Sequence, residues 1–280
     1  MKKINNALIK DYTTYKLSGQ VKEVIIPSNI LELKEAIRNL GDKKYKIIGN
    51  GSNLIISESY DGVLIKLDFD NLVIDGTKVK VGASYSLSKL SMECAKKGLS
   101  GLEFACGIPG TVGGAIYMNA GAYGSNISDV LKSVTVLDKN YEVKVLDASL
   151  LELGYRDSIF KNNDYVILEG EFVLNYKNSD AILNDIKDIM ASRREKQPLE
   201  YPSAGSVFRN PEGYSAGRLI EKAGLKGLRV GDAEVSLKHA NFIVNRGSAS
   251  AEDVISLIDI IKDKVSEDGI MLECEQEILR

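Results

Sequence analysis

A segment near the middle of the chain is so rich in glycine that it limits what the chain can fold into. "GIPGTVGGAIYMNAGAYG", residues 107–124, carries glycine at positions 107, 110, 113, 114, 121 and 124. Glycine gives the backbone extra conformational freedom and lets another group approach the main chain closely. The segment therefore fits a flat or polyphosphate-bearing cofactor lying against main chain, or a helix crossing that needs small residues.

A second stretch favours the cofactor interpretation. "GNGSN", residues 49–53, lies between two apolar runs, where glycines let backbone N–H groups approach an anion. A plain turn would explain this stretch if it stood alone. It has no lysine where a Walker loop needs one, and it does not open a helix as the Gly-x-Gly-x-x-Gly fingerprint does. The usual nucleotide motifs are thus absent.

The hydrophobic spacing predicts an α+β chain in three parts. Residues 1–65 form a βαβ-like unit, with a helix over 30–40. Residues 66–178 contain short strands, a helix over 86–98 and a hairpin turning at Lys139-Asn140.

The third part, residues 179–280, begins with an amphipathic helix over 179–197, for which Ser179 is the expected N-cap. Ser250 is placed to cap a later helix, with Asp253 three residues on. The part ends in a strand over 270–279.

Composition excludes several classes of protein. A net charge of −3 and a pI near 5.5 argue against nucleic acid or an anionic membrane as a partner. The sequence shows no membrane-spanning run and no signal peptide, so we expect a cytoplasmic protein. Three scattered cysteines and a single histidine, His239, indicate neither a disulfide framework nor a metal site.

Seven segments occur in the order found in the MurB family of UDP-N-acetylenolpyruvoylglucosamine reductases, which the chain resembles over nearly its whole length. They are "GNGSNLIIS", "GIPGTVGGAIYMNAGAYG", "YRDSIFK", "SAGSVFRNP", "AGRLIEKAGLKG", "KHANFIVN" and "MLECE". The resemblance implies an FAD-binding fold of the vanillyl-alcohol-oxidase (PCMH) type. It assigns two α/β FAD-binding subdomains to residues 1–65 and 66–178, and a C-terminal α/β substrate domain to residues 179–280.

The resemblance also implies the reaction. NADPH, as co-substrate, reduces a non-covalently bound FAD. The flavin N5 then passes hydride to C3 of the enolpyruvyl group of UDP-N-acetylglucosamine-enolpyruvate, which yields UDP-N-acetylmuramate for peptidoglycan synthesis. The expected partner is this small molecule, and a monomer is expected. The flavin site that the resemblance implies, mostly through main chain, is Gly49, Asn50, Gly51, Ser52, Asn53, Gly107, Ile108, Pro109, Gly110, Thr111, Gly113, Gly114 and Ala115.

Hydride addition to C3 leaves negative charge at C2 and on the neighbouring carboxylate, which calls for cationic or hydrogen-bonding groups and for a proton. By resemblance Arg156 stabilises this enolate, beside a substrate-contacting Tyr155. Ser206 is the implied proton donor, although an arbitrary serine in such a stretch is more often a loop or capping residue.

By resemblance Glu275 is the acidic residue near the substrate carboxylate. Glu273 and Glu277 alternate with it, so on a strand all three would share one face, and the pattern alone does not choose among them. Lys196 and Asn210 match substrate contacts, with the diphosphate a natural partner for the lysine. A solvated helix end explains Lys196 equally well, and His239 and Asn241 are expected to be structural.

The chain departs from the family in reading Leu17-Ser18-Gly19 after its "TTY" element. It also lacks the tyrosine-bearing insertion of longer members, which puts a tyrosine-lid contact in doubt. Two other hypotheses remain: a binding module that keeps the flavin domain without reduction, and an oxidase of small alcohols. Intact Arg156, Ser206 and Glu275 argue against the first, and the match in the last hundred residues argues against the second.

Overall fold

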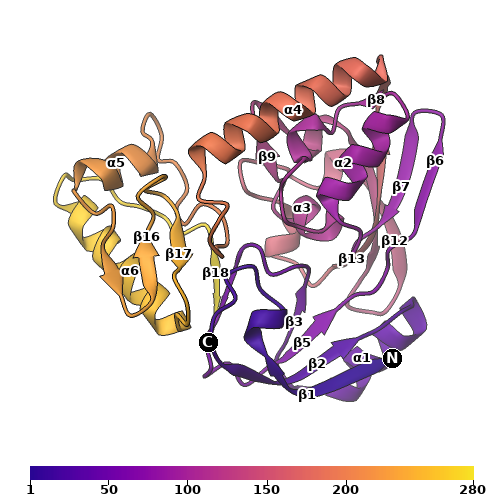
Figure 1. Ribbon diagram of the computed structural model, residues 1–280. Helices are drawn as coiled ribbons and strands as arrows, with labels where there is room; N and C mark the ends of the chain where they lie inside the picture. The colour runs from indigo at the N-terminus through magenta and orange to yellow at the C-terminus, as the bar shows by residue number, and fades with distance from the viewer. The chain divides into compact units, whose positions relative to one another are not determined.

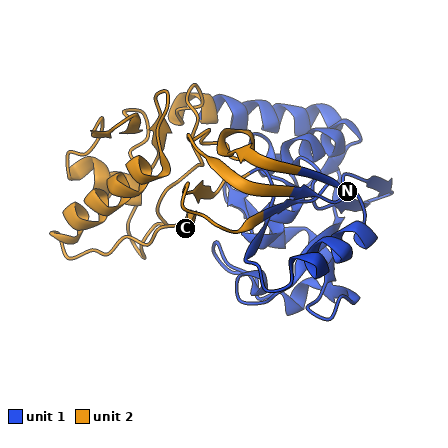
Figure 2. Ribbon diagram, turned by 90° about the horizontal axis from the view of Figure 1, so that it is seen from below, with its two compact units in different colours: residues 1–3, 25–50, 64–192 blue, residues 4–24, 51–63, 193–280 orange.

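The computed structural model describes all 280 residues, and they form two compact units, each built from segments far apart in the sequence (Figure 2). Unit 1 comprises residues 1–3, 25–50 and 64–192, and unit 2 comprises residues 4–24, 51–63 and 193–280. The three-part division made from the sequence remains a prediction. None of the helices is long and apolar enough to span a membrane.

The centre of unit 1 is an antiparallel five-stranded sheet in the order β12-β11-β13-β7-β6 (Figure 1). Its strands are β6 (Leu72–Asp75), β7 (Lys78–Gly82), β11 (Leu131–Leu137), β12 (Val143–Asp147) and β13 (Val166–Val173). Strands β11 and β12 form the predicted hairpin, with Leu137 opposite Val143. Helix α3 (Val112–Tyr117) packs on β13, where a Cβ on Gly170 would lie 2.8 Å from the Ile116 Cδ1.

The remaining short strands of unit 1 lie outside this sheet. They are β3 (Tyr45–Ile48), which neighbours β5 (Val63–Lys66), and two antiparallel pairs, β8 (Leu99–Ser100) with β14 (Asn175–Tyr176) and β9 (Gly121–Ala122) with β10 (Ser125–Asn126). Five single 3₁₀ turns complete the chain, at Ile9–Asp11, Glu103–Ala105, Ile127–Asp129, Ala148–Leu150 and Ile159–Lys161.

The predicted helices of unit 1 are confirmed, with one change at a cap. Helix α1 is Ile30–Leu40 and α2 is Leu87–Lys96. Helix α4 (Ser179–Lys196) begins as predicted, but Ser179 is not its N-cap. The Asn178 Oδ1 accepts from the Ala181 amide at 3.1 Å, while the Ser179 hydroxyl donates to the Ala95 carbonyl oxygen at 2.8 Å. The side chain of Ser179 thus ties α4 to α2.

A buried cluster joins those two helices. Ala95 of α2 packs with Ile182 and Ile186 of α4 and with Cys106, and in Figure 1 the two helices lie side by side. Because burial of such side chains contributes roughly 25 cal/mol per Å² of apolar surface, this contact fixes α2 against α4. It therefore also fixes the glycine-rich segment that follows α2.

Unit 2 contains a three-stranded antiparallel sheet of β15 (Arg229–Val230), β16 (Ala233–Val235) and β17 (Ile243–Asn245). Helices α5 (Ala216–Lys222) and α6 (Ala251–Ser266) belong to the same part. The predicted capping box of α6 is confirmed: the Ser250 hydroxyl accepts from the Asp253 amide at 3.1 Å, and the Asp253 carboxylate accepts from the Ser250 amide at 2.9 Å. Strands β1 (Lys2–Leu8) and β2 (Gln20–Ile26) are neighbours.

The predicted final strand over 270–279 is wrong in extent. Only β18 (Glu277–Leu279) is a strand, and it pairs in parallel with β4 (Leu54–Ile56). The segment before it changes partners, because Cys274 bridges to Phe208 whereas Glu277 donates its amide to the Asn53 carbonyl oxygen. No single ladder can continue through such a change, so the chain bends at Gln276.

Candidate functional site

The two glycine-rich loops meet in unit 1. A Cβ added to Gly49 would lie 2.5 Å from the Thr111 Oγ1, which is well inside van der Waals contact. The Asn50 side chain donates from Nδ2 to the Pro109 carbonyl oxygen at 3.1 Å. The structure therefore brings together the first half of "GNGSN" and the segment from 107 to 115, as a shared ligand requires.

Some of the glycines serve close packing. The Gly113 amide donates to the Ala83 carbonyl oxygen at 2.8 Å, and a Cβ on Gly113 would lie 2.9 Å from the Ala83 Cβ. Gly107 has φ +79°, and its amide donates to the Ser88 hydroxyl of α2 at 2.9 Å. The tight-packing alternative thus explains part of the segment, and the cofactor interpretation must account for the rest.

Backbone N–H groups without acceptors in the protein support the cofactor interpretation for the remaining part of the glycine-rich segment. Gly110 and Thr111 are buried, yet their amide N–H groups reach no acceptor of the protein. A buried backbone N–H almost always has a partner. The neighbouring chain is held in place, because Gly110 gives its carbonyl oxygen to the Leu87 amide at 3.1 Å and Val112 donates to the Tyr85 carbonyl oxygen at 2.9 Å. Two fixed, unpaired N–H groups fit an anionic group such as a diphosphate.

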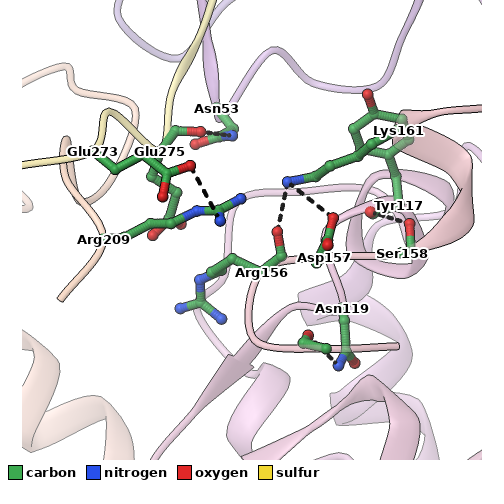
Figure 3. Close-up of polar contacts among 11 residues, drawn as sticks. Asn53, Tyr117, Asn119, Arg156, Asp157, Ser158, Lys161, Arg209, Glu273 and Glu275 are labelled. Carbon is green, nitrogen blue, oxygen red and sulfur yellow. Dashed lines mark hydrogen bonds and ion pairs between the residues drawn. The ribbon is translucent and has the colours of Figure 1, made fainter. Parts of the chain in front are cut away.

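The second half of the first loop belongs to unit 2. Gly51 has φ +63°, and a Cβ there would lie 2.2 Å from the Tyr12 carbonyl oxygen. Asn53 uses its side chain as well as its main chain, since its Nδ2 donates to the Glu275 carbonyl oxygen at 3.1 Å (Figure 3). Asn53 thereby positions the segment that carries Glu275. The sequence analysis did not predict this role for Asn53.

Arg156 lies in unit 1 in an unusual conformation. Its φ is +57°, a left-handed backbone that side chains other than glycine, asparagine or aspartate seldom adopt. The Lys161 Nζ donates to the Arg156 carbonyl oxygen at 2.5 Å (Figure 3), and the Arg156 Nη2 donates to the Gly121 carbonyl oxygen at 3.0 Å. The guanidinium carbon lies 5.4 Å from the centre of the Tyr155 ring, which is 58% exposed. Surrounding bonds hold this strained backbone in place, which is typical of functional positions.

Two residues that sequence reasoning did not single out anchor this turn. The Asn119 side chain donates from Nδ2 to the Gly154 carbonyl oxygen at 2.9 Å, and the Ser158 hydroxyl donates to the Tyr117 carbonyl oxygen at 2.6 Å (Figure 3). Both anchors connect the Arg156 turn to the end of α3. The end of α3 thus helps to fix the position of the Arg156 guanidinium. This helix directly follows the unpaired N–H groups of Gly110 and Thr111. The only sequence signal for Asn119 is its place within the glycine-rich segment.

The structure brings Ser206 and Glu275 onto facing segments of unit 2. The Glu275 amide donates to the Val207 carbonyl oxygen at 2.8 Å, and the Arg209 amide donates to the Glu273 carbonyl oxygen at 3.0 Å. Ser206 is half-buried, and its hydroxyl makes no hydrogen bond to the protein. This leaves the Oγ available to a ligand.

The three alternating glutamates have different surroundings. Glu273 is 68% exposed and forms an ion pair with Arg209 at 3.2 Å (Figure 3). Glu277 is part of β18, opposite Leu54. Glu275 is half-buried and lies where the chain changes partners. The expectation that all three share the face of one strand is wrong, and the environment of Glu275 differs from that of its neighbours.

Asn241 holds the Ser206 loop, a role that sequence reasoning left as merely structural. Its Oδ1 accepts from the Phe208 amide at 2.9 Å and its Nδ2 donates to the Phe208 carbonyl oxygen at 2.8 Å, while the Asn241 carbonyl oxygen accepts from the Val207 amide. The Asn241 side chain thus pairs with the N–H and C=O groups of Phe208 as the backbone of a neighbouring strand would. His239 is half-buried against Phe242, with ring centres 4.8 Å apart, and burial lowers its pKa.

The two expected substrate contacts differ in how they are held. The Asn210 Oδ1 accepts from the Ala216 amide at the start of α5 at 3.0 Å, so its carbonyl is already occupied. Lys196 is exposed in the last turn of α4. The structure thus gives Asn210 a local structural partner and presents Lys196 to solvent.

Comparison with known proteins decides the family. Residues 197–279 match the C-terminal domain of UDP-N-acetylenolpyruvoylglucosamine reductase, and residues 21–147 match an FAD binding domain. The chain is 45% identical over 267 residues to the UDP-N-acetylenolpyruvoylglucosamine reductase of Clostridium novyi (strain NT), which covers 94% of this chain and 87% of that protein. The chain belongs to the UDP-N-acetylenolpyruvoylglucosamine reductase family.

Two further relatives agree with this placement. The reductase of Clostridium tetani (strain Massachusetts / E88) is 45% identical over 264 residues, covering 93% of this chain and 86% of its own length. The crystal structure of UDP-N-acetylenolpyruvylglucosamine reductase (MurB) from Thermus caldophilus superposes with a TM-score of 0.87 at 38% identity, over 100% of this chain and 98% of that one. The predicted α+β flavin-binding fold is confirmed, and the protein is an FAD-dependent oxidoreductase of the MurB family.

Proposed function

We propose that the protein reduces the enolpyruvyl group of UDP-N-acetylglucosamine-enolpyruvate to UDP-N-acetylmuramate, with NADPH as the electron donor. When bound, FAD would supply the hydride chemistry between NADPH and the C3 of the substrate. The observation that carries the proposal is the pairing of the Ser206 loop with the Glu275 segment, at 2.8 Å between the Glu275 amide and the Val207 carbonyl oxygen. The residues proposed as proton donor and acidic group thus lie on facing segments of unit 2.

The fit of FAD rests on the unpaired N–H groups of Gly110 and Thr111 and on the contact between the two glycine-rich loops. Main chain of 49–53 and 107–115 would hold it without a covalent bond. Two predicted flavin residues, Gly51 and Gly113, would act by letting their loops pack tightly against Tyr12 and Ala83 rather than by direct contact with FAD.

Arg156 would stabilise the charge that develops on the substrate carboxylate. A planar guanidinium can donate two parallel hydrogen bonds to a carboxylate, and such preorganised donors are often the largest single contribution to catalysis. The guanidinium carries five N–H donors, and its Nη2 donates to the Gly121 carbonyl oxygen at 3.0 Å, which helps to fix its direction.

Ser206 would give its proton to C2. A serine hydroxyl is a weak acid, but an enolate carbon is strongly basic, so no histidine is needed to activate it. Glu275 would lie near the substrate carboxylate, where like charge raises the pKa of a glutamate and favours its protonated, donating form. Lys196 and Asn210 would contact the rest of the substrate, with Lys196 facing the diphosphate. We also propose that the protein acts as a monomer in the cytoplasm.

The test separates the two half-reactions under anaerobic conditions. Ser206→Ala should leave reduction of the flavin by NADPH nearly unchanged and slow reoxidation by the enolpyruvyl substrate by about 10²–10⁴-fold. Ser203→Ala, in the same loop, is the matched control and should change neither rate. Equal slowing of both half-reactions by Ser206→Ala would make Ser206 structural and refute its assignment.

A further inference from the structure

The buried side chain of Gln276 contacts three carbonyl groups of the Ser206 loop. The Nε2 of Gln276 lies 3.1 Å from the Ala204 carbonyl oxygen and 3.4 Å from the carbonyl oxygens of Gly205 and Ser206. Gln276 is only 4% exposed, so its amide is largely shielded from solvent. Three successive carbonyl groups therefore converge on a single amide.

The glycine in the middle of the loop makes this convergence possible. Gly205 has φ +75°, and a Cβ there would have no atom within 4 Å. Glycine is thus favoured at this position by backbone conformation rather than by space. The left-handed turn points the flanking carbonyl groups inward toward Gln276, while the Ser206 hydroxyl takes no part in the arrangement.

A buried tyrosine sets the orientation of the Gln276 amide. The Tyr15 hydroxyl donates to the Gln276 Oε1 at 3.0 Å, and Tyr15 is fully buried. Burial raises the pKa of Tyr15, which keeps the hydroxyl protonated as a donor at every physiological pH. The Tyr15 hydroxyl donates to Oε1 while Nε2 faces the carbonyl groups, and the reversed amide orientation would direct Oε1 at three carbonyl oxygens that can only accept.

We propose that Gln276, oriented by Tyr15, is a positioning residue that sets the direction of the Ser206 hydroxyl toward C2 of the substrate. The inference rests on the proposed role of Ser206. Gln276 directly follows Glu275, so one short segment would carry the acidic group and fix the proton donor. Buried polar groups with all partners in place are suited to this task, because they specify a single arrangement.

The geometry predicts two consequences of losing the Gln276 donor. Proton transfer should slow, because misplacement by about 1 Å can cost up to about 100-fold in rate. The product should also lose stereochemical purity. C2 becomes a stereocentre when it receives the proton, and a displaced Ser206 would let water deliver that proton from the other face.

The test uses the flavin-loaded protein and five variants. Gln276→Leu removes the donor, and Gln276→Glu keeps the acceptor for Tyr15 but replaces the donor by a second acceptor. Both should slow reoxidation of the reduced flavin by about 10–100-fold, leave its reduction by NADPH unchanged, and yield product with mixed configuration at C2. Tyr15→Phe, which keeps the ring and the Gln276 donor, should cause a smaller loss of the same kind.

The double variant Ser206→Ala/Gln276→Leu distinguishes positioning from simple stability. It should react no more slowly than Ser206→Ala, because Gln276 acts through a group that is already missing. A further slowing by the full Gln276→Leu factor, or unchanged stereochemistry in Gln276→Glu, would overturn the inference. If Ser206→Ala itself leaves reoxidation unchanged, the proposed function of Ser206 fails first, and that result is separate from any result with Gln276.

Discussion

Replacing Gly51 by alanine should destabilise the protein by more than its backbone conformation alone explains. Two costs add. An L-residue at φ +63° bears the left-handed penalty of about 1–2 kcal/mol. The new Cβ would also lie 2.2 Å from the Tyr12 carbonyl oxygen and 2.8 Å from the Thr13 Cα. Because both neighbours are backbone, they cannot rotate away, and overpacking of this kind typically costs about 1–3 kcal/mol.

A matched control isolates the second cost. Gly213 has φ +75°, and a Cβ there would meet nothing within 4 Å. Gly213→Ala should therefore lower the free energy of unfolding by only the conformational penalty, about 1–2 kcal/mol. Gly51→Ala should lower it by about 2–5 kcal/mol, a sum of the two costs above.

Urea unfolding of the flavin-loaded variants, followed by circular dichroism, measures this difference. Fluorescence titration with FAD reports on the loop itself, and only Gly51→Ala should weaken FAD binding, because its loop alone must shift. Equal destabilisation by the two variants, or unchanged FAD affinity in Gly51→Ala, would show that the loop yields to the methyl group without strain and would refute the reasoning.

Three further predictions concern other parts of the site. Asn241→Ala should cost about 2–4 kcal/mol in urea unfolding, because it leaves the buried Phe208 N–H and C=O groups unpaired; a loss below about 1 kcal/mol would contradict this. Burial lowers the pKa of His239, so protonation opposes folding, and the unfolding free energy should fall as the pH drops through about 6.5. His239→Gln should flatten that part of the pH profile, and a parallel profile would exclude the effect. Arg156→Lys should slow flavin reoxidation by about 10²-fold with flavin reduction unchanged, and an equal effect on both would argue against enolate stabilisation.

Local patterns in the sequence predicted many elements of the fold because their causes are local. The spacing of apolar residues identified α1 and α2, and the Ser250–Asp253 capping box marked the start of α6. The N-cap of α4 was misplaced by one residue because Asn178 and Ser179 are both good caps, and a tertiary contact with Ala95 recruits the serine. Propensity alone cannot detect such a contact.

The residues expected at the candidate site stay predictions, and the side chains that support them were not predicted from the sequence. Arg156, Ser206 and Glu275 were named from a family pattern, and they remain proposals. Alternation suggested a strand through 270–279, but alternation says nothing about a change of partner at Gln276. Asn119 and Asn241 act through long-range bonds to main chain, which leave no periodic trace in a single sequence.

The bond between Tyr15 and Gln276 has a consequence for how the protein folds. The two residues are 261 positions apart in the sequence, and unit 2 is assembled from three stretches separated by the segments of unit 1. Loop-closure entropy disfavours early contacts of such high separation, and topologies dominated by them fold slowly. We therefore expect unit 1 to become ordered first and shorten the effective loop. The hydrogen bonds from Tyr15 to Gln276, and from Gln276 to the carbonyl groups of residues 204–206, would then be among the last contacts to form during folding.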